Sequence, residues 1–407
     1  MVPKKCQVGV IGAGLSGIIC ALECQRHGLE TVILESSQKV GGRLQSEIIQ
    51  GAICDRGFQV FLPSYPTAKK WVKSLNINWC HYPRSAQIID RDCQWFGLPW
   101  LTPEKYQIGG RLKPTLYDYL QLSKDSLKGL FFNNRLDEDY PTETYFNHSY
   151  SKEFAGKFLK PFFRGVFLDR DLMAPIPLFQ YYLNLFLRGG VAIPENGMGE
   201  ITRKLALGLQ KNSLFLNKKV QKVILNQNRW VLKTHDCEEL HADVVVIATD
   251  DHQACKLFPE LGNPSTPLPL STHFFLTNNI PEKLGPLNLF PNGKSIHGIA
   301  IPTIVAPKYT NGNFHLLMIT THGSKHIHKE DILKELMQLS ILESEKWEWI
   351  HHIPLGQTLP KTRKVIFENP NLIFAGDWTC LPSIEGACQS GEHAAKKASY
   401  YIQKQSI

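Results

Sequence analysis

The sequence has 407 residues, of which 43% are hydrophobic, and carries a formal net charge of +8. A chain of this length and apolar content buries one large core or two joined ones, which excludes a disordered protein. Lysines and arginines are scattered without long runs, so we expect no nucleic-acid partner and leave peripheral contact with a membrane open. We expect a cytoplasmic protein, because the first residues lack a signal-peptide pattern and no run of about eighteen apolar residues occurs.

Cysteine and histidine spacing gives no metal signature. The ten cysteines are spread along the chain, and without a secretion signal we expect reduced thiols. Cys20 and Cys24 lie four positions apart on a predicted helix but have no matching second pair, so we interpret them as core thiols. His322, His326 and His328 fall in the polar stretch THGSKHIHKED, which is typical of a solvated loop. We therefore predict no metal site.

A glycine-rich turn follows the first apolar run. VGVIG is typical of a buried parallel strand and ends at Gly12, and an apolar helical pattern runs from Leu15 and Ser16 onward. Gly12, Gly14 and Gly17 form G-x-G-x-x-G between the two. The first glycine permits the tight turn, the second lets the backbone approach a pyrophosphate, and the third lets helix and strand pack closely. The order strand, turn, helix predicts a dinucleotide-binding unit.

A second strand, ETVILE, ends in an acid at the spacing that this unit requires. The Glu35 carboxylate can accept both ribose hydroxyls and would repel a 2′-phosphate, which disfavours NADP. Ser36 follows directly. At this point NAD and FAD fit equally well.

The segment KVGGRLQSE separates the two cofactors. Gly41 and Gly42 let the backbone lie along a second face of the pyrophosphate, Arg43 can pair with it, and Leu44 follows. This pattern resembles the flavin-containing amine oxidoreductases, a superfamily that includes phytoene desaturases and protoporphyrinogen oxidases. The resemblance implies FAD, and the cysteine context of covalent attachment is not seen, so we expect non-covalent FAD.

The C-terminal passage NLIFAGDWTCLPSIEGACQSGEHAAKKA resembles the closing motif of the same family. It predicts a strand over residues 372–375, a turn at Gly376 and Asp377, and a helix from near Ser383. The resemblance implies that Asp377 contacts the ribityl or phosphate oxygens. It also implies that Ser383, Ile384, Glu385, Gly386 and Ala387 direct a helix N-terminus at the flavin N1/O2 edge. A helix N-terminus stabilises the negative charge of a reduced flavin there.

Weaker similarities add further candidates. CDRGFQVFLPSYP resembles the family segment that passes close to the isoalloxazine, which suggests Gly57, Phe58 and Gln59, although a plain turn remains an alternative. Val220 corresponds to an adenine-contacting valine, or belongs only to the core. Ala248 and Thr249 end a predicted parallel strand beside the nucleotide. We assign Phe58, Gln59, Trp378 and His352 to the substrate pocket.

The expected fold is α/β, with a Rossmann-like FAD-binding domain of the glutathione-reductase type, built from a parallel sheet plus a β-meander. We assign residues 1–75, 195–255 and 361–407 to it. Residues 76–194 and 256–360 would form a second, α+β substrate domain. In the first of these segments strands fade and aromatic helical stretches dominate, as in EFAGKFLKPFFRGVFL.

The predicted function is that of an FAD-dependent oxidoreductase. It would dehydrogenate a bulky apolar or amine small-molecule substrate by hydride transfer to flavin N5, with reoxidation by dioxygen, a quinone or another acceptor. No residue is assigned a catalytic role, and the oligomeric state is left open. Two alternatives remain: a non-enzymatic binder of prenylated ligands, similar to Rab GDP-dissociation inhibitors, and a non-redox flavin enzyme similar to galactopyranose mutases. The second would need pocket arginines, for which Arg164 and Arg188 are candidates.

Overall fold

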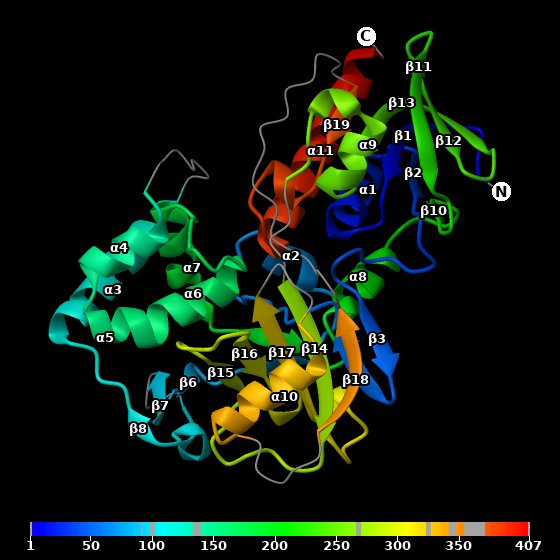
Figure 1. The fold of residues 1–407 in the computed structure, drawn as a ribbon. Coiled ribbons are helices and arrows are strands. Elements are labelled where there is room, and N and C mark those ends of the chain that lie inside the picture. The colour runs from blue at the N-terminus through cyan, green and yellow to red at the C-terminus, as the bar shows by residue number, and fades with distance from the viewer. Residues whose placement is uncertain are drawn as a thin grey trace.

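Two large sheets organise the molecule. The structure is a computed structural model that describes residues 2–90, 92–97, 102–132, 140–265, 270–322, 327–341, 347–353 and 371–405. One sheet carries the N-terminus and both long helices of the nucleotide-binding region, the other lies beneath it, and a group of helices projects to one side (Figure 1).

The first sheet has seven strands in the order β10-β2-β1-β13-β12-β11, with β19 paired to β13. Its strands are β1 (Lys5–Ile11), β2 (Thr31–Leu34), β10 (Leu214–Phe215), β11 (Val220–Asn226), β12 (Arg229–Thr234), β13 (Glu239–Ile247) and β19 (Leu372–Phe374). β1, β2, β10, β13 and β19 pair in parallel, whereas β11, β12 and β13 form an antiparallel meander. This architecture confirms the predicted parallel sheet with a β-meander. The carboxyl ends of β1, β2, β13 and β19 meet at one edge.

Two helices from opposite ends of the chain pack together against this sheet. They are α1 (Leu15–Arg26) and α11 (Ile384–Gln405). Their approach is so close that a side chain at Gly391 would come within 2.6 Å of the Ser16 carbonyl. The shorter α2 (Ala68–Val72) packs against α11 and α8 (Gly199–Ala206) against α1, whereas α9 (Asp251–Leu257) contributes to the core on the other face of the sheet. The 3-10 turn η4 (Pro259–Leu261) follows α9, and η7 (Asp377–Thr379) precedes α11. Cys20 and Cys24 are fully buried in α1, which confirms their interpretation as core thiols.

The second sheet has eight strands in the order β18-β14-β17-β16-β15-β6-β7-β8. These are β6 (Ser85–Ile89), β7 (Cys93–Gly97), β8 (Gly110–Arg111), β14 (Leu270–Thr277), β15 (Leu287–Leu289), β16 (Ile296–Ala300), β17 (His315–His322) and β18 (Glu348–Ile353). Helix α10 (Lys329–Gln338) covers one face, where its Ile332 and Leu336 join a core with Phe275 and Leu317. The expectation that strands fade after residue 76 is therefore wrong for β6 and β7, which extend this sheet.

The helical group consists of α3 (Leu116–Gly129), α4 (Thr142–Ser149), α5 (Lys152–Phe154), α6 (Lys160–Phe167) and α7 (Ile176–Gly189). A π-helical turn, η3 (Ala155–Leu159), joins α5 to α6. The aromatic side chains contact one another: the ring centroid of Phe163 lies 4.8 Å from that of Phe179. These aromatics form a core, as their helical spacing predicts.

Short elements complete the fold. They are the hairpin β3 (Ser46–Ile49) and β4 (Ala52–Asp55), the pair β5 (Trp79–His81) and β9 (Ala192–Pro194), and the 3-10 turns η2 (Glu104–Tyr106), η5 (Pro302–Ile304) and η6 (Pro307–Tyr309). Within the ranges given above, none of the helices has the length and apolar character needed to cross a bilayer.

Candidate functional site

The three glycines of the first turn have different surroundings. Gly12 has φ +104°, and a side chain there would come 2.8 Å from the Ala248 carbonyl oxygen. At Gly17 a side chain would come 2.0 Å from the Gly12 carbonyl oxygen, so both positions need glycine for the fold itself. Gly14 has ordinary angles, φ −72° and ψ 177°, and nothing lies within 4 Å of the place where a side chain would begin. Gly14 therefore borders open space at the N-terminus of α1.

The carboxylate of Glu35 points toward this turn. Its Oε2 atom accepts a hydrogen bond from the Ala13 amide at 2.6 Å, while Oε1 accepts from the Ser37 amide and hydroxyl at 2.8 Å each. The Ser36 hydroxyl also donates to Oε1, at 3.3 Å. The Glu35 carbonyl accepts from the Lys218 amide at 2.7 Å, which brings the start of the meander and the buried Val220 to the end of β2.

The second glycine pair lies directly beside the first turn. The Gly41 amide donates to the Ala13 carbonyl at 2.8 Å, and Gly14 and Gly41 form a parallel bridge. A side chain at Gly42 would begin 3.4 Å from the Gly14 Cα atom. The Leu44 side chain is buried in the core, and its carbonyl accepts from the Thr202 hydroxyl at 2.9 Å. Two glycine-rich elements thus face the same open space.

An ion pair joins the two ends of the chain at this place. The Arg43 guanidinium donates to the Asp377 carboxylate, across 334 sequence positions. Asp377 is buried, while Arg43 is 38% exposed and thus keeps an accessible side. Gly376 has φ +143°, and its amide donates to the Ser390 hydroxyl at 2.9 Å, which ties the turn to α11.

The first turn of α11 begins where the sequence predicts. The Ser383 hydroxyl accepts from the Gly386 amide at 3.0 Å, and the Ser383 carbonyl accepts from the Ala387 amide at 2.9 Å. A side chain at Gly386 would come 1.8 Å from the Leu381 carbonyl, so only glycine fits. A helix start leaves amides without helical partners. Those of Ile384 and Glu385 lie in this first turn.

The Glu385 side chain holds a neighbouring helix, whereas the resemblance concerns only the helix N-terminus to which Glu385 belongs. Its carboxylate is fully buried and accepts from the amides of Thr67 and Ala68 at 2.8 Å each and from the Gln389 side chain at 2.9 Å. These contacts cap the N-terminus of α2. The Glu385 side chain is therefore committed to holding α2 against α11, and only its backbone remains a candidate for the cofactor.

Gly57, Phe58 and Gln59 lie between the two sheets. Gly57 has φ +90°, and a side chain there would come 3.5 Å from the Thr272 hydroxyl of β14. The Gln59 side-chain amide donates to the Arg43 carbonyl at 3.0 Å, so this segment is fixed to the second glycine pair. The Phe58 ring makes an edge contact with Tyr82 at 6.1 Å between centroids.

The assignment of Trp378 to the substrate pocket is corrected by its position. Trp378 is 1% exposed within a core cluster of the first sheet, and its indole N–H donates to the Thr249 carbonyl at 2.9 Å. The side chain thus fastens the closing turn to the end of β13, beside Ala248. It lines the core rather than a pocket.

The assignment of His352 is also corrected, because strand alternation turns it to the other face. His352 pairs with His273, and their rings stack 4.3 Å apart, on the face of β14 that also carries Phe275 and packs toward α10. Its neighbour His351 pairs with Phe274, on the face that carries Thr272 and faces Gly57. His351 is therefore the histidine on the face that lies toward Gly57.

An acid that the sequence analysis missed links the β3–β4 hairpin to the entry of α8 and to η6. Asp55 is 2% exposed and accepts hydrogen bonds from the Ser46 hydroxyl at 2.5 Å, the Met198 amide at 2.9 Å and the Tyr309 hydroxyl at 2.7 Å. Burial raises the pKa of Asp55 to about 6, although these hydrogen bonds act in the opposite direction. The signal for it was an acid that directly follows the apolar strand pattern AIC.

The polar stretch with three histidines does not form a single loop. His322 ends β17 with its ring edge-on to His297, and His328 begins α10, while His326 lies outside the described residues. Over the described ranges, no three Cys, His, Asp or Glu side chains come together in a way that could hold a metal ion. Of the candidate pocket arginines, Arg164 donates to the Arg170 carbonyl at 2.8 Å and Arg188 is exposed at the end of α7.

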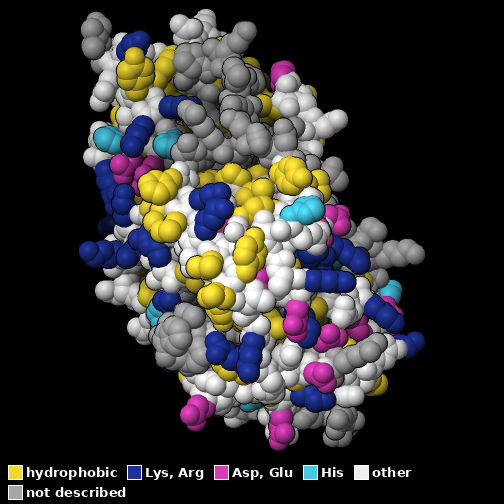
Figure 2. Space-filling view, turned by 90° about the vertical axis from the view of Figure 1, so that its left-hand side faces the viewer, with side chains coloured by type: hydrophobic (Ala, Val, Ile, Leu, Met, Phe, Trp, Pro, Cys, Tyr) yellow, Lys and Arg dark blue, Asp and Glu magenta, His cyan; other side chains and the backbone are white. Residues whose placement is uncertain are grey.

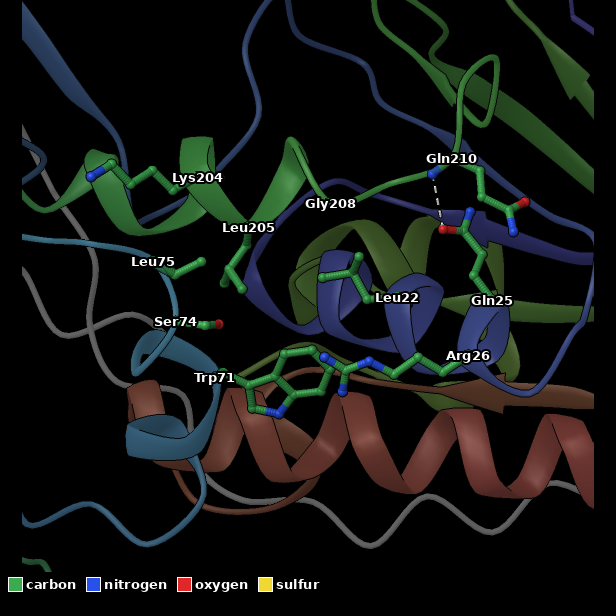
Figure 3. Close-up of a pocket in the computed structure, with 10 residues that line it drawn as sticks. All are labelled: Leu22, Gln25, Arg26, Trp71, Ser74, Leu75, Lys204, Leu205, Gly208 and Gln210. Atoms are coloured by element: carbon green, nitrogen blue, oxygen red, sulfur yellow. Dashed lines mark hydrogen bonds between the residues drawn. The ribbon is translucent and has the colours of Figure 1, made fainter.

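A surface groove of about 350 Å³ lies elsewhere, between α1, α2 and α8 (Figure 3). Its lining includes Leu22, Leu75 and Leu205, and the Arg26 guanidinium lies over the Trp71 ring, 4.4 Å from its centroid. None of its ten lining residues belongs to the set predicted to bind the cofactor. The groove and the space in front of Gly14 are separate features.

The geometry in front of Gly14 defines a class of protein. A glycine turn at a helix N-terminus, an acid at the next strand end, a second glycine pair and a second helix start meet at one sheet edge. These features are those of an α/β protein that binds an extended dinucleotide. The open space at Gly14 and the accessible side of Arg43 fit a diphosphate, and the start of α11 offers amides for a ring that carries negative charge.

The chain belongs to the flavin-containing amine oxidoreductase family: the family description "Flavin containing amine oxidoreductase" matches residues 15–269, more than half of its length. The family description bears out the predicted flavin cofactor and the predicted class of flavin-dependent oxidoreductase.

Individual similarities are more distant. Mitochondrial protoporphyrinogen oxidase from Nicotiana tabacum is 27% identical over 217 residues, covering 49% of this chain and 40% of that protein. Coproporphyrinogen III oxidase from Bacillus subtilis is 23% identical, covering 63% and 62%. The chain thus spans less than two thirds of the length of these curated relatives. Cyclohexylamine oxidase from Brevibacterium oxydans shares the fold with a TM-score of 0.73 at 15% identity, covering 98% of this chain and 100% of that chain.

Proposed function

We propose that this protein dehydrogenates a bulky apolar or amine small-molecule substrate with FAD as hydride acceptor, and that dioxygen, a quinone or another acceptor reoxidises the cofactor. The observation that carries the proposal is the meeting of the first and last segments, with the Arg43–Asp377 ion pair beside Gly14 and Gly41. A protein that only binds prenylated ligands would not need the C-terminal segment to meet the glycine-rich turns in this way.

We propose the following residues for the cofactor. The turn from Gly12 to Gly17 and the glycine pair with Arg43 would hold the diphosphate, because their amides and the guanidinium are donors without side chains in the way. Glu35 would accept from the ribose, since its Oε2 atom accepts only the Ala13 amide among the contacts of the described residues. Asp377, with the first-turn amides of α11, would hold the ribityl and ring end.

Bound FAD supplies the hydride acceptor, at its N5 atom. The protein has to orient the substrate C–H bond and exclude water. The face of β14 that lies toward Gly57 carries Thr272, Phe274 and Leu276. Phe274 and Leu276 belong to the large apolar core cluster. We propose that this face and the Phe58 segment form the apolar walls of the substrate site. We also propose that the chain is divided between a cofactor and a substrate domain as the sequence suggests.

The experiment has two stages on purified protein. The first stage measures the flavin absorption band at about 450 nm. The band should be present in the isolated protein or appear when FAD is added, and denaturation should release the flavin. The second is anaerobic bleaching of that band by amines, polyenes and porphyrinogens. Bleaching by one class and recovery on admitting air or a quinone is the expected result.

Two outcomes would contradict the proposal. Protein that binds no FAD under any condition would favour the binder of apolar ligands. Protein that holds FAD but is bleached by none of the substrate classes, and forms an adduct with a sugar nucleotide after chemical reduction, would favour the non-redox alternative.

A further inference from the structure

Helix α3 presents its leucines to solvent. Leu116, Leu120 and Leu127 are 76%, 63% and 61% exposed, and Phe131, just after the helix, is 82% exposed. Their spacing of four, seven and four residues places all of them on one stripe of the helix. Scattered exposed apolar residues are ordinary, whereas a continuous stripe of this size marks an interaction surface.

The opposite face of α3 is polar and buried. Asp118 and Asp125 have no exposure. Asp118 accepts from the Ser151 amide and hydroxyl at 2.7 Å each. Asp125 accepts from the hydroxyls of Tyr145 and Tyr150 at 2.7 and 2.6 Å and from the Gln180 side chain at 2.8 Å. These bonds fix the rotation of the helix, because turning the leucines inward would expose or break them.

Among the described residues 111–132, the exposed charged side chains beside the stripe are all positive. Arg111, Lys113, Lys124 and Lys128 are exposed, whereas both acids of residues 111–132 are buried. Lys124 and Lys128 are four residues apart and flank the stripe on one side. Figure 2 shows hydrophobic side chains gathered, with lysines and arginines among them, on the side of the molecule that the helical group forms. Figure 1 places α3 at the outer edge of that group, away from the nucleotide-binding sheet.

We propose that α3 docks this protein on an anionic lipid surface, with the leucine stripe in the boundary between headgroups and acyl chains. A helix that lies flat on a bilayer combines an apolar face with lysines at its margin, which approach the lipid phosphates. The core of a protein interface is instead depleted of lysine, so a second copy or another protein is the less favoured occupant. The proposal does not depend on the proposed function.

The test is flotation of the full-length, FAD-loaded protein with lipid vesicles. Wild type should float with vesicles that contain about one third phosphatidylglycerol and bind neutral phosphatidylcholine vesicles at least tenfold less. The double variant Leu120→Gln/Leu127→Gln should lose at least tenfold in binding, because glutamine retains helix propensity but not apolar area. Lys124→Gln/Lys128→Gln should remove most of the preference for anionic lipid and its sensitivity to salt.

The matched control is Leu207→Gln, which alters an exposed leucine (84%) that follows α8 and should leave flotation unchanged. Thermal unfolding and the flavin spectrum of each variant show that it is folded. The proposal is overturned if folded wild type stays unbound with both vesicles, or if the leucine variants bind as wild type does. It is equally overturned if light scattering finds that wild type and the other variants are dimers and the leucine variant is a monomer, because the stripe would then contact a second copy.

Discussion

At the scale of single residues, the three glycines of the first turn meet different requirements. Gly12 and Gly17 meet backbone atoms of the protein itself, whereas Gly14 meets nothing within 4 Å and has angles that any residue adopts. Sequence spacing alone assigns all three to one motif. Only the geometry shows that the middle one, unlike the other two, borders open space.

We therefore expect Gly14→Ala and Gly14→Val to fold with nearly unchanged stability and to lose FAD. The added carbons would occupy the place of the diphosphate. The measurement is the ratio of flavin to protein absorbance after dialysis, together with the melting temperature of the cofactor-free protein. Full flavin retention in Gly14→Val would place the cofactor elsewhere.

Gly17→Ala is the matched control, because it adds the same methyl group three residues away. Its Cβ would lie 2.0 Å from the Gly12 carbonyl, so it should lower the stability of the cofactor-free protein, by roughly 1–3 kcal/mol as overpacking does. A Gly17→Ala protein as stable as Gly14→Ala would mean that the turn adapts.

Single residues also show where sequence reasoning ends. The sequence analysis assigned His352 to the pocket, but which of His351 and His352 lies on the face toward Gly57 depends on a shift of one residue, fixed only by pairing with β14. Trp378 lies next to Asp377 in the motif, yet the turn sends one side chain to Arg43 and the other into the core. Neighbours in a motif need not share a site.

At the scale of elements, α11 serves both the cofactor edge and the neighbouring α2. The start of α11 was predicted from the resemblance of the C-terminal passage to the closing motif of the family. The five-residue α2 is too short to be stable by itself. It depends on the Glu385 carboxylate, which accepts both Thr67 and Ala68 amides, and no local pattern in α2 reveals a partner more than three hundred residues away.

We expect Glu385→Ala to destabilise the protein by about 2–4 kcal/mol, because it leaves two buried amides without an acceptor. Urea unfolding measured at neutral pH gives this value. Glu392→Ala is the control on the same helix: it removes a half-buried acceptor of the Trp71 indole at 2.8 Å and should cost about 1 kcal/mol. If the two variants lost the same free energy of unfolding, the contacts that cap α2 would contribute no more to stability than the Trp71 hydrogen bond.

β6 and β7 show the opposite case, in which elements were missed. CQWFG contains a glycine and a polar residue, which weaken a strand pattern. Gly97 is required nonetheless, because a side chain there would come 2.4 Å from the Arg84 carbonyl. The strands form because β6 pairs with β15 on one side and with β7 on the other. A local sequence pattern does not reveal these pairings.

At the scale of the whole molecule, Asp55 ties the β3–β4 hairpin to the entry of α8 and to η6 next to the second sheet. Its folded-state pKa of about 6 lies above the ordinary value of 3.8. Ionisation therefore opposes folding: this contribution to stability is complete below pH 4 and is lost as the pH rises through 6.

We expect the stability of Asp55→Asn relative to wild type to increase by about 2 kcal/mol between pH 4 and pH 7, since one pKa unit corresponds to about 1.4 kcal/mol and part of the shift is already titrated at pH 4. Urea unfolding of both proteins at several pH values measures this difference. Asp118→Asn is the control. Burial raises the Asp118 pKa, but hydrogen bonds from Ser151 and Thr115 outweigh it and lower the pKa below 3.8, so its difference from wild type should stay constant above pH 4.5. A flat profile for Asp55→Asn would contradict the assignment.

The contact between Arg43 and Asp377 also sets an order of events in the cell. The two residues are 334 positions apart, and a ribosome adds about 5–20 residues per second. The N-terminal half of the anion-binding edge therefore exists for about 15 to 70 s before its counterpart is synthesised. Tight cofactor loading has to wait for that late segment, so ribosome-bound chains that stop short of it should carry no flavin.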